Sequence, residues 1–256
     1  MPIASPSAKK PRRSNKAEHG TSLRIAFQGI RDLIVHGKLS PGTWIVEGDL
    51  AKHLGMSRTP VRGALHWLQR EGYVHEHKNV SKSRMFVAPL TKDDASELYA
   101  IIGRIEGMAG RQTAALPKLE RVAIADQLRE INQQLAVISG TKSSGAGGIF
   151  DLDRSFHRLI VGAGAGPRLS ALHGAIEPQT ERYWRLYASS IIDDLHLSIE
   201  EHEKIIDAIV DGDANRVEKG LRVNWENGSQ RLARVIDMFG ERGSGVVFRC
   251  RTVCGA

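Results

Sequence analysis

The chain has 256 residues, of which 41% are hydrophobic and 25% are charged, and its formal net charge is +7. This length allows two domains, the excess of positive charge favours a polyanionic partner, and the two cysteines, Cys250 and Cys254, cannot form a disulfide framework. No apolar run reaches the roughly 18 residues of a membrane helix and no secretory signal is recognisable, so we expect a cytoplasmic bacterial protein without membrane contact.

The first 20 residues are rich in Ser, Pro, Ala and Lys, and Lys and Arg far outnumber the single Glu18. Such a segment cannot bury enough apolar surface to become ordered. We therefore predict a disordered basic tail over residues 1–20. It is either inert or adds a sequence-independent attraction to phosphates.

Residues 21–90 carry the pattern of a small DNA-binding domain. A helix is predicted over 23–36, a turn over 39–42 and a short strand over 44–46. Two helical segments, 47–54 and 58–70, are then joined by Gly55-Met56-Ser57, and two short helices joined by a turn that contains Gly are typical of a helix-turn-helix. Alternating residues over 73–76 and 85–87 predict two strands of a hairpin wing.

The second of these helices has two distinct faces. Val61, Ala64, Leu65 and Leu68 have the spacing of a buried face. An adjoining polar stripe consists of Arg58, Thr59, Arg62, His66 and Gln69. Arg and Gln side chains can bind base edges in the major groove through two hydrogen bonds, so the stripe predicts a recognition helix. The alternative is an ordinary amphipathic helix with a solvated polar face.

The start of this helix and the wing supply the remaining candidate contacts to double-stranded DNA. Ser57 is placed to cap the helix, and Pro60 lies in the first turn, where a missing N–H does no harm. The basic hairpin tip over 77–84 is placed to contact the DNA backbone or minor groove, or else is a solvated tip. The predicted DNA-binding residues are Ser57, Arg58, Thr59, Arg62, His66, Lys78 and Lys82.

Several short strings within residues 20–90 resemble the winged-helix domain of the GntR family of bacterial transcription regulators. They are Gly-Lys-Leu-Ser-Pro-Gly at 37–42, Leu-Ala at 50–51, Leu-Gly-Met-Ser-Arg-Thr-Pro-Val-Arg at 54–62, Ala-Leu at 64–65 and Glu-Gly at 71–72. Two positions depart from the family pattern. Gly63 replaces a usually acidic residue, and Gly48 replaces an Arg that helps to read bases in many members, so the resemblance implies that one base contact is absent.

From Thr91 onward the pattern is helical only. Thr91 with Asp93 and Asp94 predicts a capped helix start. Helices are expected over about 91–115, 117–139, 149–162, 167–189, 197–210 and 213–239, with a Gly-rich loop over 140–148. The tail 240–256 should be irregular, and its two cysteines are too few to bind a metal. The predicted fold is therefore mainly α, with an N-terminal winged helix-turn-helix and a C-terminal all-α bundle over 91–239.

Four polar residues in the predicted bundle could meet around one point. Asp153 and His157 are four residues apart and project from one helical face. His202 lies on the fifth helix of the bundle, and Asn224 lies on the sixth. A carboxylate with imidazoles suits Zn, Ni, Fe or Mn, although such residues can also be polar groups without a metal.

The same positions resemble the FCD ligand-binding domain of the FadR subfamily of GntR regulators. In that domain an Asp and three His bind a divalent metal. The resemblance implies that Asp153, His157 and His202 bind Zn, Ni or Mn, with Asn224 at the position of the third His as a weaker ligand.

The resemblance also implies a small carboxylate effector near this metal. The family often anchors it with an Arg at the position that Ile102 occupies here, and Arg104 lies two residues further on. Arg182 and Arg185 are further candidates. All three arginines could instead be solvated surface residues.

Together these patterns predict a transcription regulator rather than an enzyme. We expect it to bind a pseudo-palindromic operator as a homodimer, and the resemblance implies that it represses transcription. Two alternatives remain open. One is a metal-dependent hydrolase that uses Asp153, His157 and His202, although no nucleophile or general-base motif accompanies them. The other is a non-specific architectural DNA binder that relies on charge alone.

Overall fold

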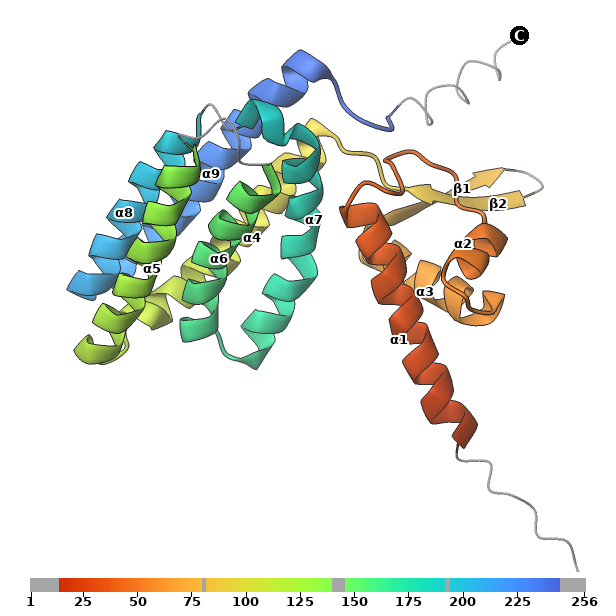
Figure 1. The fold of residues 1–256 in the computed structure, drawn as a ribbon, viewed down its shortest axis with the longest axis horizontal. Coiled ribbons are helices and arrows are strands. Elements are labelled where there is room, and N and C mark those ends of the chain that lie inside the picture. Colours follow the sequence, from red (N-terminus) through yellow and green to blue (C-terminus); the bar gives the residue numbers. More distant parts are fainter. Residues whose placement is uncertain (1–13, 80–81, 140–145, 192–193, 245–256) are drawn as a thin grey trace, which may run out of the picture. The chain divides into compact units, whose positions relative to one another are not determined.

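The computed structural model describes residues 14–79, 82–139, 146–191 and 194–244 and divides into two compact units (Figure 1). One unit contains the described residues up to Leu33 together with Trp44–Val87, and the other contains Ile34–Thr43 and the described residues from Ala88 onward. Most of the predicted basic tail, the first part of the loop over 140–148 and both cysteines lie outside the described residues.

The N-terminal unit is a winged helix-turn-helix, as predicted. Its elements are α1 (Ser14–Val35), α2 (Glu47–His53), α3 (Arg58–Arg70), β1 (Val74–Asn79) and β2 (Lys82–Val87). The turn between α2 and α3 passes through Gly55 at a φ of 63°, which glycine adopts without steric cost. The two strands pair antiparallel, with Val74 opposite Val87 and Asn79 opposite Lys82, and form the wing.

The apolar face of α3 forms the core of this unit. The predicted face is confirmed, because Val61, Ala64, Leu65 and Leu68 are fully buried. Phe27 of α1 stacks on Trp67 of α3 with ring centroids 4.3 Å apart. This packing leaves the opposite, polar side of α3 exposed to solvent.

Three local predictions for the N-terminal unit differ from the structure. Residues 14–20, predicted to be disordered, form the first turns of α1, because a helix nucleated by a packed segment extends at low cost through residues such as Lys16, Ala17 and Glu18. The strand expected over 44–46 is only an isolated bridge between Trp44 and Phe86. Ser57 is the N-cap residue of α3, but its side chain makes no capping hydrogen bond.

The second unit is the predicted helical bundle. Its described helices are α4 (Lys92–Ala114), α5 (Lys118–Ser139), α6 (Ala146–Gly164), α7 (Pro167–Ile191), α8 (Leu195–Asp211) and α9 (Ala214–Phe239). One prediction for this unit differs from the structure, because α6 begins at Ala146, within the loop predicted over 140–148. The Thr91 hydroxyl accepts a hydrogen bond from the Asp94 N–H at the start of α4, as predicted. Gly212 ends α8 in the left-handed conformation, and the Asp213 side chain then caps α9.

Helix α4 packs against α6, α7 and α9 within this bundle. Glycines make the close approaches possible: a Cβ atom added at Gly103 would lie 2.9 Å from Trp225 Cβ on α9. At Gly164, the last residue of α6, an added Cβ would overlap the Ala109 carbonyl oxygen of α4. These contacts fix the helices that carry the polar residues described below.

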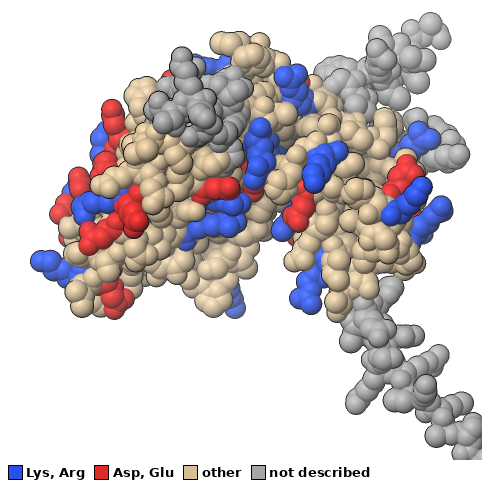
Figure 2. All heavy atoms as spheres, in the orientation of Figure 1, with Lys and Arg blue, Asp and Glu red and all other residues tan. Residues whose placement is uncertain are grey.

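Charges of both signs are interspersed over the face of the helical unit drawn in Figure 2. Exposed ion pairs of this unit include Arg129–Asp126 and Arg216–Asp211. Among the residues that the structure describes, none of the helices combines the length and the apolar character that a membrane crossing requires.

Candidate functional site

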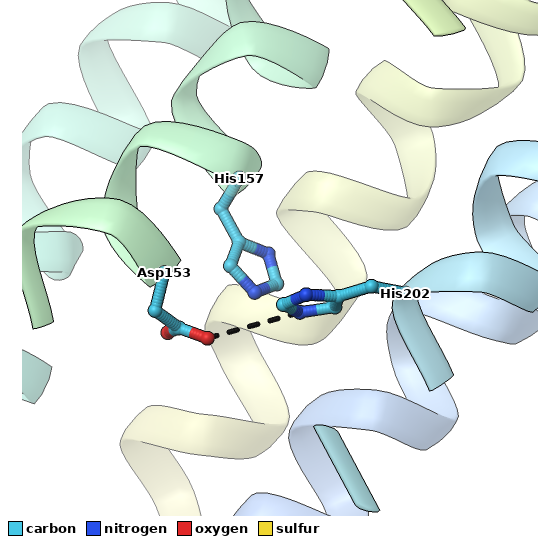
Figure 3. A group of neighbouring side chains, drawn as sticks. All are labelled: Asp153, His157 and His202. Atoms are coloured by element: carbon cyan, nitrogen blue, oxygen red, sulfur yellow. Dashed lines mark ion pairs between the residues drawn. The ribbon is translucent and has the colours of Figure 1, made fainter. Parts of the chain in front are cut away.

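Asp153, His157 and His202 form a cluster in the interior of the helical unit. Asp153 and His157 project from one face of α6 toward His202 on α8 (Figure 3). One ligand atom from each of the three side chains lies within 4.8 Å of the others, and His202 Nε2 is 3.7 Å from Asp153 Oδ1. The i, i+4 spacing on α6 and the packing of α8 therefore bring the predicted residues together.

Asn132 determines which nitrogen of His202 faces the cluster. The Asn132 amide nitrogen donates to the Ile199 carbonyl, at 3.2 Å, and to Glu203, at 2.6 Å. Its amide oxygen therefore accepts a hydrogen bond from His202 Nδ1, at 3.0 Å, and the lone pair of His202 is on Nε2. That Nε2 is buried without a hydrogen-bond partner among the described residues, next to Asp153.

The environment of His202 keeps the imidazole neutral, as a metal ligand must be. Burial is the main cause that lowers the pKa of His202 well below its ordinary value, and the positive charge of His157 adds to the effect. The Phe156 ring stacks on the imidazole with centroids 3.8 Å apart and limits its rotation. An unpaired, oriented nitrogen beside a carboxylate and a second imidazole fits a divalent metal.

Glu106 orients His157 in a similar way. Its fully buried carboxylate lies 2.6 Å from His157 Nδ1 and 3.0 Å from His173 Nε2, and it accepts a hydrogen bond from Trp225 Nε1 at 2.6 Å. Carboxylates that hold the second nitrogen of a histidine are a recurring feature of metal sites. This arrangement leaves Nε2 of His157 as the nitrogen that could bind a metal.

The charges of Glu106 and His157 stabilise each other. Burial alone would raise the pKa of Glu106, but the charge of His157 and the hydrogen bonds from His157 and His173 outweigh it and lower that pKa to about 2. Burial opposes the charge of His157 as well, yet Glu106 raises the pKa of His157 to about 9. A metal bound at His157 would therefore displace a proton.

A cavity of about 60 Å³ opens beside the cluster. Asp153, His157 and Asn224 line it, and the Asn224 amide nitrogen donates to Glu201 at 2.7 Å, so the amide oxygen is the atom that could bind a metal. The other lining residues are Tyr99, Phe150, Thr180, Trp184, Leu195, Ser198, Trp225, Gly228 and Arg231. The cavity thus combines two residues of the cluster, Asp153 and His157, with aromatic walls.

The predicted DNA-contacting residues of the helix lie along one exposed face of the N-terminal unit. Ser57, Arg58, Thr59, Arg62 and His66 are all exposed. Lys78 and Lys82 lie near the tip of the wing, where their backbones pair with Ser83 and Asn79, and their side chains lie outside the described part of the structure.

Comparisons with known proteins identify a matching family for each of the two units. A family model described as "Bacterial regulatory proteins, gntR family" matches residues 24–81, and an "FCD domain" model matches residues 97–226, which is more than half of the chain. This chain belongs to the GntR family, in its FCD-domain branch. It is accordingly a transcription regulator with a domain that binds effector ligands.

Similar proteins include GntR regulators from several bacteria. A "probable D-xylose utilization operon transcriptional repressor" from Paenarthrobacter nicotinovorans is 28% identical over 207 residues, covering 78% of this chain and 85% of the relative. The "gluconate operon transcriptional repressor" from Bacillus subtilis is 23% identical over 212 residues, covering 81% and 83%.

Solved structures show the same fold. A putative GntR regulator from Rhodococcus sp. RHA1 has a TM-score of 0.59 and 25% identity, covering 83% of this chain and 97% of that one. E. coli McbR/YncC has a TM-score of 0.64 and 19% identity, covering 86% and 99%.

The arginines predicted to anchor an effector do not line the cavity of this GntR regulator. Arg104 is exposed and donates to the Ala100 carbonyl, at 2.9 Å. Arg182 donates to the Ala88 carbonyl, at 2.7 Å, and Arg185 donates to Glu181, at 2.6 Å.

Arg231 lines the cavity instead. It is buried and donates to Glu201, at 3.1 and 3.3 Å, and to Ser198, at 2.9 Å. Arg231 lies seven residues, or about two helical turns, after Asn224 on α9. This spacing places both residues on one face of the helix, and it is the sequence signal that could have identified Arg231 as a cavity residue.

Proposed function

We propose that this GntR regulator acts in the cytoplasm as a homodimeric repressor whose DNA affinity changes when a small carboxylate binds beside a divalent metal in the FCD domain. The observation that carries the proposal is the Nε2 of His202, which is buried next to Asp153 and His157 without a hydrogen-bond partner among the described residues. Asp153 and His157 in turn line a cavity. The repressor names of two relatives support the proposed direction of control.

Asp153, His157 and His202 would hold the metal, with Asn224 as a fourth ligand. Zn, Ni or Mn would suit this donor set. Such a metal supplies a positive charge that attracts a carboxylate oxygen. Glu106 and Asn132 fix the two imidazoles, and an amide oxygen at Asn224 should bind more weakly than an imidazole would.

The cavity itself supports a small carboxylate effector. Its volume of about 60 Å³ admits only a few non-hydrogen atoms without rearrangement. Phe150, Trp184 and Trp225 provide apolar walls for a short carbon chain. Arg231 places a guanidinium group on the same cavity, where it could bind a second oxygen of the effector.

Effector binding can alter DNA affinity only if the effector binds the DNA-competent and DNA-incompetent conformations with different strength. Exposed Arg58, Thr59, Arg62 and His66 are the proposed contacts to the operator on α3, with Ser57 at its start and Lys78 and Lys82 on the wing.

The decisive experiment is elemental analysis of full-length protein purified without a metal-affinity tag. We expect the wild type to contain bound metal and His202→Ala to have lost it. The control is His196→Ala, which removes an exposed histidine of the same helix α8 and should keep the metal. A chelator should lower the melting temperature of the wild type and His196→Ala only, because a ligand that binds the folded state stabilises it. Asn224→His should retain metal more strongly.

Substoichiometric metal in both the wild type and His196→Ala, even after Zn, Ni and Mn are added, would contradict the proposal. Asp153, His157 and His202 would then be polar groups that line an effector cavity without a metal.

A further inference from the structure

Arg62 on the recognition helix α3 is held by a carboxylate from the preceding helix. Glu47 is the first residue of α2. Arg62 Nε donates to both of its carboxylate oxygens, each at 3.1 Å, and Arg62 Nη2 donates to one of them at 2.8 Å. Both side chains reach solvent, with 63% of the Arg62 side chain and 32% of the Glu47 side chain exposed. The hydrogen bond from Arg62 is the main cause that lowers the pKa of Glu47, so this carboxylate is charged at neutral pH.

The geometry of this pair leaves a specific edge of the guanidinium group available. A guanidinium can donate two parallel hydrogen bonds either from its Nε and Nη2 edge or from its Nη1 and Nη2 edge. Glu47 occupies the first edge, so the second edge can bind another pair of acceptors. The O6 and N7 atoms of guanine are the pair that arginine most often binds in the major groove.

Gly48, which follows Glu47, adds an independent observation at the same place. A Cβ atom at Gly48 would lie 3.3 Å from Arg58 Nη2, so the Arg58 guanidinium lies beside this glycine. The start of α2 therefore lies beside both of these arginines of the recognition helix: Glu47 binds Arg62, and Gly48 leaves room for Arg58.

We propose that Glu47 is a positioning and specificity-determining residue, which holds Arg62 with its Nη1 and Nη2 edge directed at a guanine in each operator half-site. This inference rests on the proposed role of Arg62 in DNA reading. A side chain that is already fixed loses less conformational freedom on binding, and a fixed guanidinium discriminates more strongly against bases that lack two adjacent acceptors.

A different role for Glu47 makes the opposite prediction. If the carboxylate merely competed with DNA for Arg62, its removal would free the arginine and tighten operator binding. Both roles place a negative charge near DNA phosphates, so removal of that charge should strengthen binding to random DNA in either case. The two roles are therefore separated by discrimination between bases.

The test begins with a selection of preferred sites from a random duplex library by the full-length protein. The guanine read by Arg62 is the position whose preference is lost in Arg62→Ala. Dissociation constants are then measured at matched salt for the selected duplex, for the same duplex with that guanine pair replaced by an adenine pair, and for a random duplex. The proteins are the wild type, Glu47→Gln, Glu47→Asp and Asp49→Asn.

We expect Glu47→Gln to reduce the guanine-over-adenine preference by about three- to tenfold while its affinity for the random duplex rises. Asp49→Asn removes the same charge from an exposed position in the first turn of α2 and should raise random binding without changing the base preference. Glu47→Asp keeps the charge but has a shorter side chain. This variant should therefore lose preference for guanine over adenine without a gain in affinity for the random duplex. Such an exposed ion pair adds little to stability, so all variants should remain folded.

An unchanged base preference in Glu47→Gln, or tighter binding of this variant to the selected duplex with the preference retained, would overturn the inference. The proposed role of Arg62 fails separately, if Arg62→Ala binds the selected duplex as well as the wild type does.

Discussion

Glu106 is a single buried residue on which three hydrogen bonds converge beside the proposed metal site. Its two oxygens accept from His157, His173 and Trp225, and a glutamine in its place would offer one oxygen and an amide group that can only donate. We predict that Glu106→Gln lowers metal affinity about 10- to 100-fold, as loss of such a supporting carboxylate typically does. Competition with a chromogenic chelator measures this affinity. Glu97→Gln, at an exposed position on the same helix, should match the wild type, and equal affinity in both variants would contradict the supporting role of Glu106.

Arg58 is an exposed residue at the first position of α3. If it contacts a base edge, Arg58→Ala should weaken binding to the selected operator by about 1–3 kcal/mol, with a smaller loss on random DNA. Fluorescence anisotropy at matched salt concentrations checks both values. An equal loss on operator and random DNA would reassign Arg58 to the phosphate backbone, since phosphate contacts carry no sequence information.

At the scale of elements, the contact between α4 and α6 brings Glu106 to His157. Gly164 allows this approach, because a Cβ atom there would overlap the Ala109 carbonyl and lie 2.8 Å from the Thr113 backbone nitrogen. Backbone atoms cannot move aside as the end of a side chain can, so Gly164→Ala should destabilise the protein by about 1–3 kcal/mol.

A matched control for this substitution lies two residues earlier on the same helix. A Cβ atom at Gly162 would meet no atom within 4 Å, and alanine favours the helical conformation by about 1 kcal/mol over glycine. Gly162→Ala should therefore match or exceed the wild type in melting temperature, whereas Gly164→Ala should fall below it. Calorimetry of the wild type and the two variants measures these melting temperatures. Equal values for the two variants would show that the close approach of α6 to α4 at Gly164 does not limit stability.

The helices could be predicted from the sequence because their signals are local. Thr91, Gly212 and Asp213 mark helix ends within one turn, and the predicted bounds of α3 match the structure. The Asp153 and His157 pair also follows from local spacing. Glu106 and Asn132 could not be assigned in this way, because their partners lie 51 and 70 residues away and meet them only through helix packing. The same applies to Arg231, which reaches Glu201 across 30 residues.

At the scale of the whole molecule, the proposed binding to a pseudo-palindromic operator needs two DNA-binding units at a fixed separation. The helical unit offers a surface that could provide this link. Ile101, Arg104 and Met108 lie along one exposed stripe of α4, with 38% of Ile101 and 55% of Met108 accessible to solvent. Apolar side chains repeated at helical spacing on an exposed face are typical of a helix that packs against a partner.

We therefore predict that the helical domain carries the dimer contacts. A fragment that ends at Leu90 should be monomeric in light scattering and should bind the operator poorly, because a single recognition helix makes too few contacts. Full-length Met108→Glu, which places a charge on the α4 stripe, should dissociate at concentrations where the wild type is dimeric, since burial of an unpaired charge is costly. Leu172→Glu provides the control, because it adds the same charge at an exposed apolar position on α7. A dimeric fragment would place the interface in the N-terminal unit, and a dimeric Met108→Glu protein would place it elsewhere on the bundle.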